Sequence, residues 1–230
     1  MKSPDDFKTS RPRSYVLRQG RITPAQRTAL DELMPKFGLS ADAAFDPLTS
    51  FGRQAPLFLE IGFGNGETLL QTATAEPDHD FIGIEVHAPG VGHLLLGLTR
   101  LQIANVRVYR TDAAELLERQ VPDSTFDGIM IYFPDPWPKS RHHKRRLIDT
   151  EFVELAASKL KPQGIFHAAT DWRDYADQIL EAAIRCERLT NCAIEGGFSA
   201  RPPRRPLTKF ERRGLAKGHG VWDIVFRRSD

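Results

Sequence analysis

The sequence predicts an α/β fold built on one doubly wound, mostly parallel sheet of seven strands with an antiparallel edge strand. Short apolar runs alternate with longer helix-like segments from Leu57 onward, which is the order expected of repeated β-α-β units. The chain has 230 residues, of which 40% are hydrophobic and 27% are charged. It is therefore long enough for one well-buried domain.

The elements follow one another in a regular order. Short, mostly apolar runs predict the parallel strands, at residues 57–61, 81–86, 106–109, 126–133 and 165–170. Segments with helical character follow these strands, at residues 67–75, 91–103, 112–120, 147–160 and 174–187. The two runs at 193–195 and 221–226 could pair as an antiparallel edge. Together these elements indicate a Rossmann-like sheet.

The first 54 residues are predicted to form a basic, partly flexible extension before a domain at 55–230. Basic residues outnumber acidic ones at its start, and Thr23 followed by Pro24 is typical of a helix N-cap with proline in the first position. A solvated tail and an RNA-contacting arm fit this charge equally well.

The composition excludes several classes of protein. The formal net charge is only +2, so a nucleic-acid surface would have to come from local clusters of basic residues. The two cysteines, Cys186 and Cys192, match no zinc spacing and no disulfide framework, and we expect no metal. No signal peptide or membrane-spanning stretch is evident, which predicts a soluble, cytoplasmic protein.

An acidic residue stands at or just past the end of every predicted parallel strand: Glu60, Glu85, Asp112, Asp135 and Asp171. Ligands of open α/β sheets bind at this edge. A single acid there is often only a helix cap, and for Asp112 alone that interpretation is equally good. Five acids on one rim favour a ligand that is cationic or rich in hydroxyl and amino donors.

The turn after the first strand carries Gly62, Gly64 and Gly66, which allow a ligand to approach the backbone closely. Their spacing is not that of a dinucleotide site, and Glu60 would be poorly placed beside a pyrophosphate. A sulfonium with an amino-acid head suits Glu60, while Glu85 suits ribose hydroxyls and Asp112 an adenine amino group. S-adenosylmethionine fits this pattern better than NAD.

The fourth strand ends in a stiff loop that contains Pro134, Pro136 and Pro138, because proline cannot extend a ladder. This loop carries Asp135 and Trp137, and residues 139–146 add five Lys or Arg and no acid. A second basic segment holds Arg201, Arg204, Arg205, Lys209, Arg212, Arg213 and Lys217. Each cluster alone could be a solvated face, but together with the basic N-terminus they favour RNA as the partner.

These residues resemble the blocks of the bacterial tRNA (guanine-N7-)-methyltransferase family, in family order and over nearly the whole chain. The most specific block is F-P-D-P-W-P-K-x-R-H-x-K-R-R-L at 133–147. Weaker blocks lie at 13–16, 18–21, 60–66, 83–87, 112–115, 169–172 and 208–212. The resemblance implies a class I methyltransferase sheet, S-adenosylmethionine as cofactor and methylation of N7 of a guanosine in the tRNA variable loop (position 46 of the tRNA).

The resemblance also implies roles for particular residues. Asp135 would be the catalytic acid. The cofactor would be bound by Glu60, Gly62, Gly64, Gly66, Glu85, Asp112 and Asp135. The substrate would be contacted by Lys139, Asp171, Thr208, Lys209, Phe210 and Glu211. RNA would be contacted by Arg141, His142, His143, Lys144, Arg145 and Arg146.

The chemistry agrees with this expectation. Guanine N7 already presents an in-plane lone pair, so the reaction requires no metal and no base to remove a proton first. The enzyme must align the reacting atoms and oppose the positive charge that develops on the purine, which suits Asp135. Trp137 could stack a base or pack within the protein. No obligate protein partner is evident, and either a monomer or a homodimer is expected.

Three other readings stay open at this point. An amino-group methyltransferase is one, because Asp135-Pro136-Trp137 is similar to the Asp-Pro-Pro-aromatic motif of that class, although the second proline is missing. A non-catalytic RNA-binding protein on a decayed scaffold is another, although decay should erode the ligand-facing acids. An NAD-dependent dehydrogenase is the third, and the glycine spacing disfavours it.

Overall fold

The computed structural model describes residues 12, 14–15, 21–208, 211–212 and 220–230. Two residues expected to contact substrate, Lys209 and Phe210, lie outside these ranges. So do Arg213 and Lys217 of the second basic segment and most of the basic residues expected near the N-terminus.

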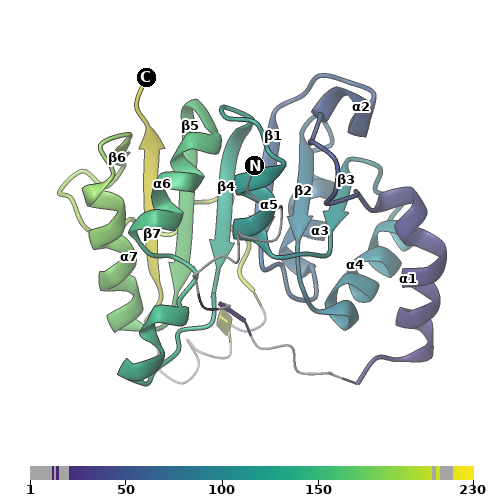
Figure 1. Ribbon diagram of the computed structural model, residues 1–230, viewed down its shortest axis with the longest axis horizontal. Helices are drawn as coiled ribbons and strands as arrows, with labels where there is room; N and C mark the ends of the chain where they lie inside the picture. The colour runs from purple at the N-terminus through teal and green to yellow at the C-terminus, as the bar shows by residue number, and fades with distance from the viewer. Residues whose placement is uncertain (1–11, 13, 16–20, 209–210, 213–219) are drawn as a thin grey trace, which may run out of the picture.

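The described residues form one seven-stranded sheet in the order β3-β2-β1-β4-β5-β7-β6. The strands are β1 (Leu57–Ile61), β2 (Asp80–Ile84), β3 (Val106–Tyr109), β4 (Phe126–Tyr132), β5 (Leu160–Thr170), β6 (Leu189–Asn191) and β7 (Trp222–Arg228). The first five run parallel, and β7 lies antiparallel between β5 and β6. The predicted fold class is confirmed. The carboxyl ends of the parallel strands form the lower edge of the sheet in Figure 1.

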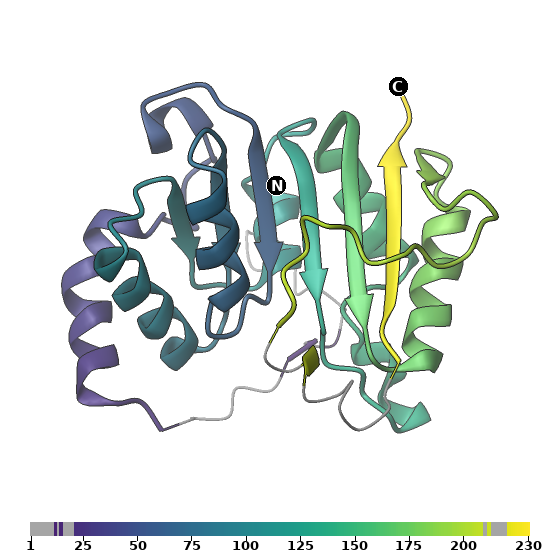
Figure 2. The same cartoon turned by 180° about the vertical axis from the view of Figure 1, so that it is seen from behind.

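Helices cover both faces of the sheet (Figures 1 and 2). One buried cluster joins the sheet to α5 (Ala113–Arg119), α6 (Thr150–Lys159) and α7 (Arg173–Arg185). A second cluster joins the other face to α1 (Pro24–Phe37), α3 (Glu67–Ala75) and α4 (Ala88–Arg100). The short helix α2 (Pro47–Phe51) precedes β1, and the 3-10 helix η2 (Ser140–Arg145) follows β4.

Part of the predicted N-terminal extension belongs to the packed structure. Thr23 caps α1 as expected, through a capping box in which its hydroxyl accepts from the Gln26 backbone N–H and its own N–H donates to the Gln26 side chain. Phe37 at the end of α1 is buried in one cluster. Phe45 is buried in the other, where its ring lies near those of Tyr109 and Phe126.

The predicted position of one edge strand is wrong. Residues 193–195 do not pair with β7; Leu189–Asn191 do, because Leu189 has the buried apolar side chain whereas Ile194 is fully exposed. Gly196 and Gly197, both with positive φ, then turn the chain back toward the sheet. The predicted pairing of an edge strand with 221–226 is otherwise correct.

Candidate active site

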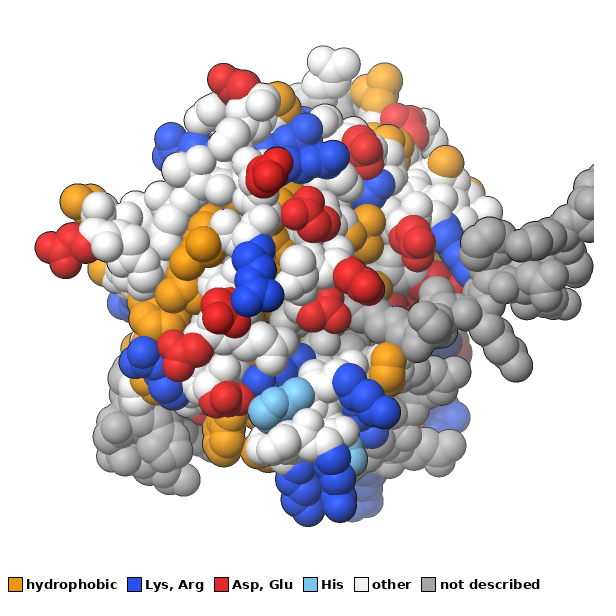
Figure 3. Space-filling model, turned by 60° about the vertical axis from the view of Figure 1, so that its left-hand side comes forward, with side chains coloured by type: hydrophobic (Ala, Val, Ile, Leu, Met, Phe, Trp, Pro, Cys, Tyr) orange, Lys and Arg blue, Asp and Glu red, His pale blue; other side chains and the backbone are white. Residues whose placement is uncertain are grey.

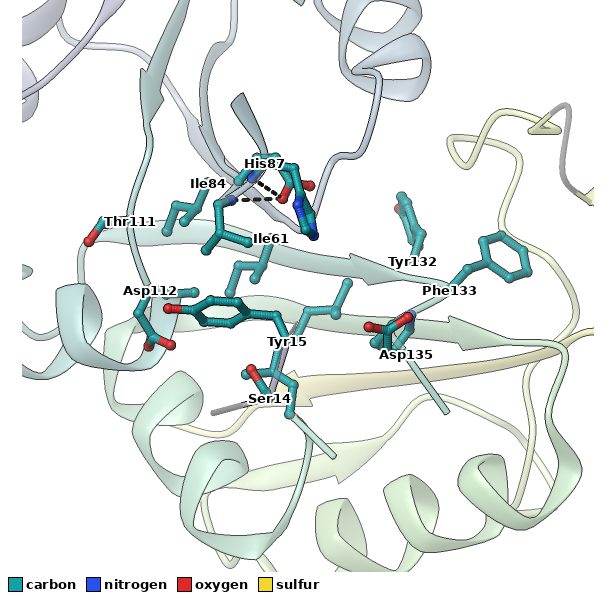
Figure 4. A pocket seen from close by; sticks show the side chains of 17 residues that line it. Ser14, Tyr15, Ile61, Ile84, His87, Thr111, Asp112, Tyr132, Phe133 and Asp135 are labelled. Carbon is teal, nitrogen blue, oxygen red and sulfur yellow. Dashed lines mark hydrogen bonds between the residues drawn. The ribbon is translucent and has the colours of Figure 1, made fainter. Parts of the chain in front are cut away.

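A pocket opens at the carboxyl ends of the four adjacent strands β1, β2, β3 and β4 (Figure 4). Its lining includes Glu85 after β2, Asp112 after β3 and Asp135 after β4. The first and last of these three acids are 50 positions apart in the sequence, and the parallel sheet brings all three to one cavity. Figure 4 shows the Tyr15 ring lying between Asp112 and Asp135.

Glu85 is buried and connects two loops of the pocket. Its Oε1 accepts hydrogen bonds from the backbone N–H groups of Val86 (2.7 Å) and His87 (2.9 Å). Its Oε2 accepts one from Gly64 (2.9 Å), in the turn after β1. A carboxylate oxygen has two lone pairs, so these contacts fill Oε1 and leave one acceptor site on Oε2.

The backbone conformation of the turn after β1 requires its glycines, and its close packing requires Gly90 on the neighbouring helix α4. Gly62, Gly64 and Gly66 all have positive φ, between 57° and 74°, which side-chain-bearing residues rarely adopt. The turn also lies so close to α4 that a Cβ on Gly90 would stand 2.2 Å from the Gly64 carbonyl oxygen. The backbone of this turn is therefore held close to the pocket without side chains in the way.

Asp112 is the N-cap of α5, where its Oδ1 accepts from the Glu115 backbone N–H at 3.0 Å. It also lines the pocket. The capping role and the ligand-facing position, which the sequence left as alternatives, are thus compatible in one side chain, since capping occupies one of two oxygens.

Glu60 does not line this pocket. Side chains alternate along β1, so Ile61 faces the pocket while Glu60 faces the other side of the sheet. Only 4% of Glu60 is exposed, and burial raises the pKa of its carboxyl from 4.5 to about 8. The carboxyl is therefore mostly protonated at neutral pH in this structure.

A stability measurement can check this protonation. Because folding raises the Glu60 pKa, the proton stabilises the folded state fully below pH 4.5, and this contribution is lost as the pH rises toward 8. We expect Glu60→Gln to be more stable than the parent at pH 8, by a few kcal/mol (order of magnitude), and to match it more closely at pH 5. Chemical denaturation at both pH values measures the difference, with the exposed Glu118→Gln as control. An equal difference at both pH values would contradict the prediction.

The loop after β4 holds Asp135 in a strained, well-anchored backbone. Phe133 and Trp137, on either side of it, have φ values of 52° and 45°, which are unfavourable for bulky residues and concentrate at functional sites. The Phe133 N–H donates to the Ala169 carbonyl (2.7 Å), and the Trp137 indole N–H donates to the Ser14 carbonyl (3.1 Å). Asp135 itself is exposed at the pocket.

Trp137 packs within the protein. The Arg145 guanidinium lies 4.0 Å from its ring centroid, and the His142 ring stacks beside it with centroids 5.9 Å apart. These contacts also place Arg145 and His142, two residues expected to contact RNA, against the loop that carries Asp135.

Arg146 differs from its expected role in RNA binding. Only 2% of it is exposed, and its guanidinium donates to the Pro136 carbonyl (2.8 Å), the Gln178 side chain (2.7 Å) and Asp174 (2.5 Å). It thus ties the Pro-rich loop to α7, and the Asp174 pKa is lowered by this hydrogen bond. A guanidinium enclosed in this way does not reach a phosphate.

The exposed basic surface consists of Lys139, Arg141 and Lys144, with His142 and His143 partly exposed beside them. Figure 3 shows Lys and Arg side chains gathered around His at the lower edge of the molecule, while acidic side chains are scattered over the face above. We call Lys139, Arg141 and Lys144 the basic edge.

The remaining predicted substrate residues lie at or near the same end of the sheet. Asp171 follows β5 and is partly exposed. The Thr208 hydroxyl accepts from the Glu211 backbone N–H at 3.0 Å. Glu211 differs from the expectation, because it is only 3% exposed and both its carboxylate oxygens bind Arg205.

Sequence reasoning missed several lining residues, namely Ser14, Tyr15, His87 and Thr111. Ser14 and Tyr15 lie in the R-S-Y-V pattern at 13–16, which carried a family resemblance but no role. Within the described ranges no group of His, Cys, Asp or Glu could hold a metal. No helix among these residues is long and apolar enough to cross a membrane.

The strand order, the antiparallel β7 and the pocket at the carboxyl edge define a class I S-adenosylmethionine-dependent methyltransferase fold. A family model described as "Putative methyltransferase" matches residues 54–224. Two solved structures share the fold: an aminoglycoside resistance methyltransferase, NpmB1 (TM-score 0.56, 17% identity, 83% of this chain and 94% of that one), and a 16S rRNA methyltransferase, KamB (TM-score 0.57, 14% identity, 78% and 91%).

Curated relatives are much closer in sequence. The chain is 59% identical to a tRNA (guanine-N(7)-)-methyltransferase of Methylococcus capsulatus, with 94% of each chain covered. It is 52% identical to the protein of the same name from Nitrosospira multiformis, again with 94% of each covered. The chain belongs to the tRNA (guanine-N(7)-)-methyltransferase family, as the sequence blocks predicted.

Proposed function

We propose that this chain transfers a methyl group from S-adenosylmethionine to N7 of a guanosine in the variable loop of tRNA (position 46 of the tRNA). The observation that carries the proposal is the placement of Asp135. It is exposed at the pocket, in a loop fixed on both sides, and the basic edge begins four residues further on. A methyl donor in the pocket and an RNA on the basic edge would meet at this carboxylate.

The pocket suits an adenosine cofactor. Glu85 keeps one acceptor site on Oε2 for a ribose hydroxyl, and Asp112 uses only Oδ1 in its cap, which leaves Oδ2 for an adenine amino group. The glycine turn offers backbone at close range. When bound, S-adenosylmethionine supplies an electrophilic methyl group. Tyr15 lies in this space and has to share or vacate it.

The role of Asp135 follows from the chemistry of guanine. The N7 lone pair attacks without prior loss of a proton, and the purine becomes positively charged as the bond forms. A carboxylate fixed nearby opposes this charge, and it can accept from the N1–H and amino group of the base. Orientation before the substrate arrives lowers the cost of reorganisation, and the anchored backbone at Phe133 and Trp137 provides it.

The direct test is methyl transfer from labelled S-adenosylmethionine to unmodified tRNA, followed by mass spectrometry of the digested nucleosides. We expect 7-methylguanosine as the product, and none from a tRNA in which the variable-loop guanosine is replaced. An amino-methylated nucleoside would favour the amino-group methyltransferase reading instead. Binding of tRNA without transfer would favour an RNA-binding protein.

A variant of Glu85 tests the cofactor site. Glu85→Gln replaces one accepting oxygen by an amide that cannot accept, and we expect S-adenosylmethionine affinity to fall by about 1–3 kcal/mol, or about 5–150-fold. Isothermal titration measures the change. Because Glu85 also joins two loops, thermal unfolding of the same variant must show that it is folded. The exposed Glu115→Gln is the control, and unchanged affinity in folded Glu85→Gln removes Glu85 from the ribose role.

A further inference from the structure

A row of polar side chains crosses the face of the sheet opposite to α5, α6 and α7. Tyr132 on β4, His167 on β5 and Asp223 on β7 follow one another across three adjacent strands. The Tyr132 hydroxyl lies 3.2 Å from His167 Nδ1, and His167 Nε2 lies 2.7 Å from Asp223 Oδ1. His167 and Asp223 are both buried.

Arg205 completes this row from the segment that precedes β7. Its guanidinium is 1% exposed and binds two buried carboxylates at once. Nε and Nη2 donate to the two oxygens of Asp223, at 2.7 and 3.0 Å. Nη1 and Nη2 donate to the two oxygens of Glu211, at 2.5 and 2.7 Å. Bidentate pairs between arginine and a carboxylate are strong, and they also fix the orientation of the two groups relative to each other.

The segment that leads to Arg205 is held in place at two points, Ser199 and Arg204. Figure 2 shows the chain between β6 and β7 crossing the face of the sheet. The neighbouring Arg204 lies 3.5 Å from the centroid of the Phe58 ring and bonds Glu76. The Ser199 N–H donates to the Asp223 carbonyl at 2.8 Å. A tail that merely followed a phosphate backbone would leave its arginines in water, because burying a charge is costly unless it is fully paired.

We propose that Arg205 is a positioning residue for the tRNA substrate. It holds Glu211, and through it Thr208, in a fixed position relative to Tyr132, the last residue of the strand from which the Asp135 loop starts. The network therefore sets the substrate-contacting segment in register with the catalytic loop. This inference rests on the proposed function. Arg205 was expected to contact RNA phosphates, but it is buried and acts from the interior of the protein.

Arg205→Lys tests the proposal, because lysine keeps the charge but cannot form bidentate hydrogen bonds with both carboxylates. We expect kcat/KM for tRNA to fall by about 10–100-fold, the scale of a misplaced substrate, with S-adenosylmethionine affinity within about twofold of the parent, since Arg205 lies outside the pocket. Hydrogen exchange should show lost protection at residues 199–208. The exposed Arg185→Lys on α7 is the matched control, and Glu211→Gln gives a milder disruption of the same network.

Three results would overturn the proposal. The first is tRNA kinetics of folded Arg205→Lys within about twofold of the parent. The second is an equal loss of cofactor affinity, which would indicate general damage. The third is unchanged hydrogen exchange at 199–208. If the parent itself does not methylate tRNA, the proposed function fails, but the exchange measurement still decides whether Arg205 fixes the segment.

Discussion

Asp135→Asn is expected to lower the rate of methyl transfer by about 100-fold or more, equivalent to about 2.7 kcal/mol. The variant keeps the shape of the side chain and removes the charge that opposes the developing purine cation. Its amide also cannot accept from both donors of the guanine edge. The loop is anchored through the Phe133 and Trp137 backbone and side-chain contacts rather than through Asp135, so the fold should be retained.

Single-turnover rates at saturating cofactor and tRNA are the proper measurement, because Asp135 also lines the pocket proposed for the cofactor. Asp78→Asn, an exposed residue at the opposite end of the sheet, is the control. If Asp135→Asn is folded, saturated and nearly as fast as the parent, Asp135 is not catalytic.

Neutralising the basic edge should lower tRNA affinity by about 100-fold at physiological salt while leaving cofactor affinity intact. The change is the triple variant Lys139→Gln, Arg141→Gln and Lys144→Gln. Phosphate contacts release condensed counterions, so each one lost should reduce the slope of log affinity against log salt by about 0.7–0.9. Titration of labelled tRNA at several salt concentrations measures both quantities.

The control for this experiment needs the same loss of charge elsewhere. Arg185, Arg188 and Arg227 are exposed at the end of the molecule opposite the pocket, and their triple replacement by Gln removes the same number of charges. It should change the slope little. If the basic-edge variant and this control have equal slopes, the basic edge is only a solvated face.

The sheet was predictable because its central strands are buried on both sides. For the central strand β1 the predicted and observed bounds agree, since a short apolar run in an α/β protein has few alternatives. They also agree for β3, which forms one edge of the sheet but is mostly buried. The antiparallel edge, formed by β6, was less predictable. An edge strand packs weakly, and only the tertiary structure could show that Leu189 rather than Ile194 reaches the core.

The candidate site followed from topology, because acids that end parallel strands necessarily share one edge. The sequence prediction did not assign the acids to one face of the sheet or the other. Side chains alternate along β1, so Glu60 and Ile61 lie on opposite faces. The burial of Arg146 and Arg205 could not be seen in the sequence. Their partners, Asp174 and Asp223, lie 28 and 18 residues away, and isolated basic runs look the same whether paired or solvated.

The position of β7 affects the order in which this protein can fold. It is made after every other strand that the structure describes, yet it lies between β5 and β6 in the sheet and pairs with both. Until residues 222–228 emerge from the ribosome, β5 presents an open edge, which invites pairing with other chains. Asp223 lies on the same strand and binds Arg205, so a nascent chain without β7 lacks one of the two carboxylates that pair with this arginine. The pairing of β5 and β6 through β7, and the ion pair of Arg205 with Asp223, can therefore form only after residues 222–228 have been made.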